Sequence, residues 1–64
     1  MNNIKLTPRE QQVLDILLER GCTNKQIGKF LHIGESTVKL HMSSILKKYG
    51  LRTRSQLIIF AKTP

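Results

Sequence analysis

Polar and charged side chains recur at helical spacing in the middle of the chain. Ser36, Lys39, Ser43 and Lys47 lie three or four residues apart, so they share one face of a helix over residues 35–49 with Leu40. Ammonium and hydroxyl groups donate hydrogen bonds to base edges and phosphate oxygens, and a leucine can contact the methyl group of thymine. We call these five residues the polar face. Its chemistry predicts nucleic-acid binding.

The residue types that serve catalysis or metal binding are few and scattered. Cys22, His32 and His41 fall in different predicted elements, and neither histidine has a carboxylate nearby to orient it. One cysteine excludes an intramolecular disulfide and a zinc finger, and it favours a reducing compartment. We therefore predict no enzyme, no catalytic residue, no metal site and no cofactor.

The charge balance points to a polyanionic partner. The 64 residues carry 11 Lys and Arg against 4 Asp and Glu, a formal net charge of +7. Residues 35–64 hold six of the basic residues and only one acidic residue, Glu35. An anionic membrane surface would attract the same charge, so the distribution of the charge matters more than its size. No apolar run is long enough to span a bilayer, and the first ten residues are too polar for a signal peptide. We expect one soluble intracellular domain over residues 1–64.

Three threonines, each followed three residues later by glutamate or glutamine, predict helix starts. Thr7 with Glu10, Thr23 with Gln26 and Thr53 with Gln56 all have the capping-box spacing. Gly21 and Gly50 stand where left-handed residues would end helices, and Gly34 is expected to supply turn geometry and a modest N-cap. The predicted fold is an all-α four-helix bundle with a helix-turn-helix. Its helices are expected at about 8–20, 24–31, 35–49 and 54–61.

Apolar residues at a period of 3.6 predict the face that each helix buries. The expected core residues are Val13, Leu14, Leu17 and Leu18, then Ile27, Phe30 and Leu31, then Val38, Met42, Ile45 and Tyr49. The last helix carries Leu57, Ile58, Ile59 and Phe60, which is more apolar surface than one face of a short helix needs.

Three ordered blocks of the sequence resemble the LuxR-type helix-turn-helix family of bacterial transcription regulators. The blocks are Leu6-Thr7-Pro8-Arg9-Glu10, Thr23-Asn24-Lys25-Gln26-Ile27 and Ser36-Thr37-Val38-Lys39-Leu40-His41. The resemblance extends from Leu6 to Ala61 and includes the spacing to Lys48-Tyr49-Gly50-Leu51 and Arg54-Ser55-Gln56.

The resemblance implies sequence-specific binding of double-stranded DNA, with the third helix in the major groove. The positions that face bases in the family match Lys39, Leu40 and Ser43. The positions near the DNA backbone match Lys25, Thr37, Lys47 and Arg54. The fourth helix often forms the dimer contact, for which Leu57, Ile58 and Phe60 are the expected residues. A cytoplasmic, nucleoid-associated homodimer follows, with RNA polymerase as a further expected partner.

The sequence departs from the family pattern at two glycines and in length. Gly28 stands where the family generally has alanine, which predicts a looser second helix, and Gly34 stands where a serine commonly caps the third. Regulators of this type usually have an N-terminal receiver or ligand-binding domain, so we expect these 64 residues to be either an excised effector domain or a short stand-alone member. The alternatives are a protein-interaction module that pairs with full-length regulators and a domain like region 4 of sigma factors. The stop at Gly50, followed by a fourth capped helix, favours the LuxR type over the sigma type.

Overall fold

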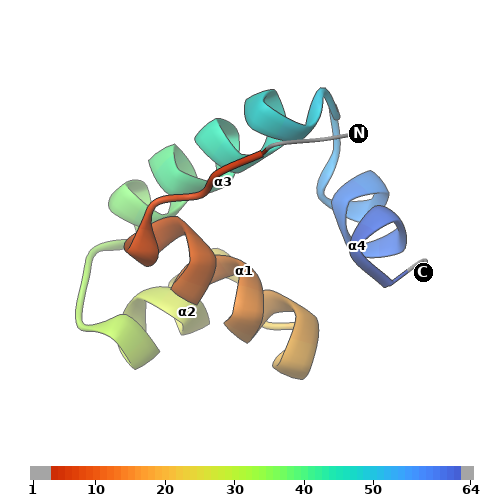
Figure 1. The fold of residues 1–64 in the computed structure, drawn as a ribbon. Coiled ribbons are helices and arrows are strands. Elements are labelled where there is room, and N and C mark those ends of the chain that lie inside the picture. Colours follow the sequence, from red (N-terminus) through yellow and green to blue (C-terminus); the bar gives the residue numbers. More distant parts are fainter. Residues whose placement is uncertain (1–3, 63–64) are drawn as a thin grey trace.

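The computed structural model describes residues 4–62, which form four α-helices and no strand. They are α1 (Pro8–Arg20), α2 (Asn24–Leu31), α3 (Glu35–Tyr49) and α4 (Arg54–Lys62). The predicted all-α fold is confirmed, and α4 extends one residue beyond the predicted end. In Figure 1, α3 lies across the top of the molecule, α1 and α2 lie beneath it, and α4 is beside its C-terminal end.

Capping boxes begin three of the helices, as the sequence predicts. The Thr7 hydroxyl accepts from the Glu10 amide at 3.1 Å, and the Glu10 carboxylate accepts from the Thr7 amide at 2.9 Å. Thr23 with Gln26 and Thr53 with Gln56 repeat the arrangement. Each box satisfies amides that a helix N-terminus otherwise leaves without partners.

Helices α1, α2 and α3 end in left-handed residues, and one of these residues is not a glycine. Gly21 and Gly50 have φ values of 62° and 68°, as expected for C-terminal caps. His32 ends α2 with a φ of 59°, because the Ile33 amide donates to the Gly28 carbonyl at 2.9 Å and closes the turn at once. The prediction that Gly34 supplies the turn geometry is therefore wrong. Gly34 is the N-cap of α3 with an extended backbone.

The core forms where α3 packs against α1 and α2, with α4 covering one end. The fully buried residues are Val13, Leu17, Ile27, Val38, Ile45 and Leu57, and the nearly buried apolar residues are Leu14, Cys22 and Met42. The expected core position of Phe30 is wrong, since its side chain is 49% exposed. The Arg20 guanidinium lies 4.8 Å from the centre of the Phe30 ring, which is a cation–π contact at the surface.

Gly28 allows a close approach between α2 and the turn that follows it. A Cβ atom at this position would lie 2.6 Å from the carbonyl oxygen of Ile33, which is backbone and has little freedom to move. Glycine therefore contributes space at this point, although it weakens helix propensity.

We expect Gly28→Ala to lower the free energy of unfolding by about 1–2 kcal/mol, because crowding outweighs the gain in helix propensity. Gly34→Ser is the matched control, since a Cβ there meets nothing within 4 Å. It should be neutral or slightly stabilising. Urea unfolding followed by circular dichroism measures both, and a more stable Gly28→Ala variant would contradict the close approach.

Candidate nucleic-acid interface

The polar face lies on the side of α3 that turns away from the core. All five of its residues, Ser36, Lys39, Leu40, Ser43 and Lys47, are exposed. The opposite side of α3 is buried through Val38, Met42 and Ile45. Leu40 is 72% exposed, the highest value among the exposed large apolar side chains of the described residues. The arrangement presents hydrogen-bond donors around one apolar contact on a single helix.

One carboxylate lies beside the polar face. Glu35, the first residue of α3, is 4.0 Å from the Lys39 ammonium one turn later. Both side chains remain half or more exposed, at 50% and 65%. The pair is therefore a surface contact that solvent screens, and Lys39 is free to exchange Glu35 for another partner.

The start of α4 is tied to the start of α2. The Arg54 guanidinium donates to the Asn24 side-chain oxygen at 2.7 Å, across 30 positions of sequence. Asn24 directly precedes Lys25 in the first turn of α2. Lys25 and Arg54 are both predicted to contact the DNA backbone, and this hydrogen bond joins the helix ends that carry them. Sequence reasoning missed Asn24, because nothing local links it to Arg54. Lys25 and Thr37 are exposed.

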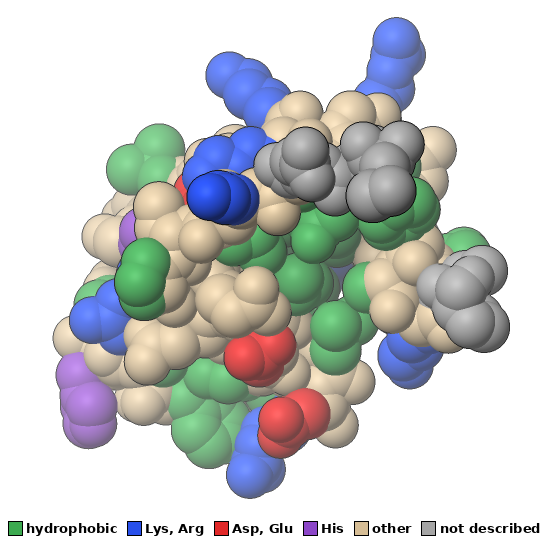
Figure 2. Space-filling view, in the orientation of Figure 1, with side chains coloured by type: hydrophobic (Ala, Val, Ile, Leu, Met, Phe, Trp, Pro, Cys, Tyr) green, Lys and Arg blue, Asp and Glu red, His purple; other side chains and the backbone are tan. Residues whose placement is uncertain are grey.

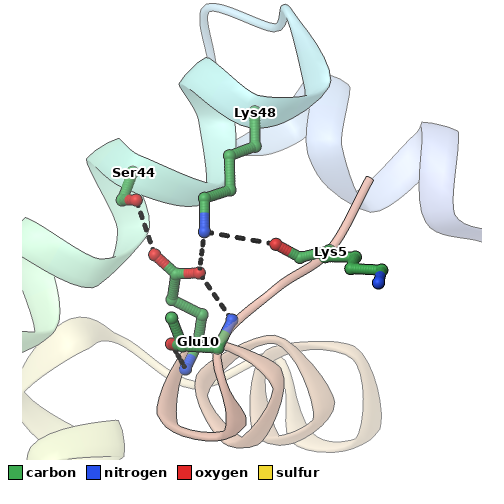
Figure 3. A network of polar contacts seen from close by, with 5 residues as sticks. Lys5, Glu10, Ser44 and Lys48 are labelled. Carbon is green, nitrogen blue, oxygen red and sulfur yellow. Dashed lines mark hydrogen bonds and ion pairs between the residues drawn. The ribbon is translucent and has the colours of Figure 1, made fainter. Parts of the chain in front are cut away.

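A buried carboxylate fixes α3 relative to α1. Glu10 is only 4% exposed, and its carboxylate accepts from the Lys48 ammonium at 2.6 Å and from the Ser44 hydroxyl at 2.5 Å (Figure 3). The Lys48 ammonium also donates to the Lys5 carbonyl at 3.3 Å. Ser44 and Lys48 are one turn apart on α3, so Glu10 holds α3 against α1 through two hydrogen bonds.

These contacts change the acidity of Glu10. The hydrogen bond from Lys48 above all, then those from Ser44 and the Thr7 amide, lower the pKa of Glu10 from 4.5 to about 2. The carboxylate is therefore ionised at neutral pH. Sequence reasoning assigned Glu10 only to a helix cap and missed its partners on α3.

Basic side chains are spread over the visible face of the molecule. In Figure 2, several project from the upper edge, and others lie at the left, at the lower right and at the bottom, where one lies next to the acidic side chains. The uneven distribution is along the sequence, since residues 35–64 carry six of the eleven basic residues and one of the four acidic residues. A polyanion is therefore attracted more strongly to the second half of the chain.

The apolar residues of α4 divide between the core and the surface. Leu57 is fully buried within the protomer, where its side chain is covered by the core. Ile58 is half-buried, and Phe60 is 43% exposed with its ring 5.3 Å from that of Tyr49 in a T-shaped contact. Ile59, which the expected interface omitted, is 67% exposed. The apolar surface that α4 exposes is therefore made by its C-terminal half.

Other kinds of site find little support in residues 4–62. No group of three His, Cys, Asp or Glu side chains there could hold a metal ion. Cys22 is buried, and His32 is exposed in the turn. None of the four helices is long and apolar enough to cross a membrane.

Comparison with known protein families identifies the family of this chain. Residues 5–61 match the family described as bacterial regulatory proteins, luxR family. The chain belongs to the luxR family. This membership confirms the expected class, a helix-turn-helix DNA-binding domain of transcription regulation and not an enzyme.

Proteins similar to this chain include three bacterial regulators. The chain is 43% identical over 56 residues to the nitrate/nitrite response regulator protein NarL of Escherichia coli, covering 88% of this chain and 26% of that protein. It is 43% identical over 54 residues to the transcriptional regulatory protein DegU of Brevibacillus brevis, covering 84% and 22%. It is 41% identical over 56 residues to the response regulator protein VraR of Staphylococcus aureus, covering 88% and 26%. The chain thus spans about a quarter of the length of these relatives.

Proposed function

We propose that the chain binds specific sequences of double-stranded DNA by placing α3 in the major groove. The observation that carries the proposal is the exposure of all five residues of the polar face, opposite the buried side of the same helix. A major groove about 12 Å wide admits one helix, and its base edges offer acceptors to lysine and serine and a methyl group to leucine. Lys39, Leu40 and Ser43 contact bases in this proposal.

Backbone contacts position α3 in the groove. Lys25 at the start of α2, Thr37 and Lys47 on α3, and Arg54 at the start of α4 serve this role. The free amides at the start of α2 add attraction for phosphate. The Arg54–Asn24 hydrogen bond supports the assignment, because it holds two of these helix ends in one arrangement.

The proposal includes a homodimer on DNA, formed through the C-terminal half of α4. Ile58, Ile59 and Phe60 offer apolar surface there, with Ile59 and Phe60 the most exposed. Dimers of helix-turn-helix proteins bind half-sites about one helical turn apart. A strict 1:1 complex in sedimentation on a duplex with two half-sites would contradict this part of the proposal.

Selection from a random duplex library on the immobilised chain tests specific binding, and two variants separate the contacts. Lys39→Ala should reduce discrimination at one base pair by about 1–3 kcal/mol. Lys25→Ala should weaken all duplexes alike and reduce the slope of log affinity against log salt by about 1. Fluorescence anisotropy at several salt concentrations measures both.

A selection that returns no enriched motif would refute specific recognition by this chain. If the chain then binds full-length regulators without DNA, its function is that of a protein-interaction module. The exposed apolar surface of α4 is the observation that favours this second function.

A further inference from the structure

Glu35 is an acidic residue at a place where DNA binding disfavours one. It is the only Asp or Glu among residues 35–64, which carry six Lys and Arg. It begins α3, and the N-terminal residues of a recognition helix lie closest to the bases and the flanking phosphates. Its carboxylate is 50% exposed and lies 4.0 Å from the Lys39 ammonium.

The ion pair contributes little to folding. Exposed pairs one turn apart on a helix are weak and screened by salt, and buried Val38, Met42 and Ile45 already hold α3 in place. The carboxylate also interacts favourably with the positive end of the helix dipole, but any acidic residue in the first turn would do the same. What distinguishes Glu35 is its partner, because Lys39 is the cation placed to read a base.

We propose that Glu35 is a specificity-determining residue that makes the chain reject unrelated duplexes. The proposal rests on the DNA-binding function above. On an unrelated sequence, binding depends on phosphate contacts, and the Glu35 carboxylate opposes them in two ways. It repels nearby phosphates, and it competes with them for the Lys39 ammonium.

On a matching sequence the Lys39 and Glu35 side chains separate, and each gains a hydrogen-bond partner on the DNA. The Lys39 ammonium donates to the O6 and N7 acceptors of a guanine, and the Glu35 carboxylate accepts from the N4 amino group of a cytosine. Because a hydrogen-bond donor then replaces Lys39 beside Glu35, the carboxylate weakens binding to unrelated duplexes and does not weaken binding to the matching one. The pair therefore acts on the ratio of specific to non-specific affinity.

Glu35→Gln tests the inference, since it removes the charge and keeps the size of the side chain. We measure affinity by anisotropy for the selected duplex and for a scrambled duplex of equal length, at several salt concentrations. The variant should bind the scrambled duplex about three- to tenfold more tightly and the selected duplex no more tightly than the unaltered chain does. The ratio of the selected to the scrambled affinity should therefore fall by about three- to tenfold, and the salt slope on scrambled DNA should steepen.

Glu19→Gln is the matched control, because it removes one exposed carboxylate from α1, which carries no residue of the polar face. It changes net charge equally and should change both affinities by the same factor. A double variant, Glu35→Gln with Lys39→Met, should show that the two substitutions are not additive. A ratio that falls no further in Glu35→Gln than in Glu19→Gln would overturn the inference, whereas failure to select any motif with the unaltered chain would overturn the proposed function itself.

Discussion

Leu57→Ala is expected to lower the free energy of unfolding by about 2–5 kcal/mol, because truncation of a fully buried leucine leaves a cavity. A chain of this size has a total stability of roughly 3–10 kcal/mol, so the variant would be partly unfolded at 37 °C. Leu57 is the one residue of α4 that is buried in the core. Thermal and urea unfolding measure the loss.

Ile59→Ala is the control on the same helix. Its side chain is 67% exposed, so the change in stability should stay within about 0.5 kcal/mol. Sedimentation on a duplex with two half-sites should instead show weaker self-association. A loss below about 1 kcal/mol in Leu57→Ala would mean that Leu57 does not anchor α4 to the core.

Glu10→Gln should lower the free energy of unfolding at neutral pH, and it should remove most of the decrease in this free energy as the pH falls. The folded pKa of Glu10 is about 2 and the ordinary value is 4.5, so the unfolded chain binds more protons between these values. The carboxylate therefore stabilises the fold above about pH 4.5, and this stabilisation is lost as the pH falls toward about 2. Gln cannot titrate, so the variant should lack this component.

At pH 7 we expect Glu10→Gln to cost about 1–2 kcal/mol, since Lys48 is 34% exposed and water partly replaces its lost partner. Lys48→Met should cost more, about 3 kcal/mol, because it leaves a buried carboxylate without its cation. Urea titrations from pH 7 to pH 2 give both profiles, with Glu19→Gln as an exposed control. Parallel profiles for the unaltered chain and Glu10→Gln would show that Glu10 does not carry this linkage.

The helix boundaries could be predicted from the sequence because their causes are local. A capping box involves residues three apart, and the left-handed ends at Gly21 and Gly50 need no knowledge of the rest of the fold. His32 escaped prediction since a left-handed histidine has no signature in the sequence. Its conformation follows from the hydrogen bond between the Ile33 amide and the Gly28 carbonyl, which depends on the path of the chain between α2 and α3.

The contacts between helices were beyond sequence reasoning. Glu10 is 34 and 38 positions from Ser44 and Lys48, and only the packing of α1 on α3 brings them together. In α4 a run of four apolar residues gives no period, so the sequence could not tell that Leu57 is buried while Ile59 is exposed. The polar face was placed correctly at the surface of α3 because Val38, Met42 and Ile45 define the opposite side by their spacing.

The burial of Cys22 makes its thiol a chemical probe of local opening of the fold. This is the only thiol in the chain, and it lies in the core, 7% exposed, directly after the left-handed residue that ends α1. An alkylating reagent reaches the sulfur only when the junction between α1 and α2 separates, so the rate of alkylation is the intrinsic rate multiplied by the fraction of open molecules. The labelling rate thus reports what fraction of the molecules have this junction, which supports the polar face, open under native conditions.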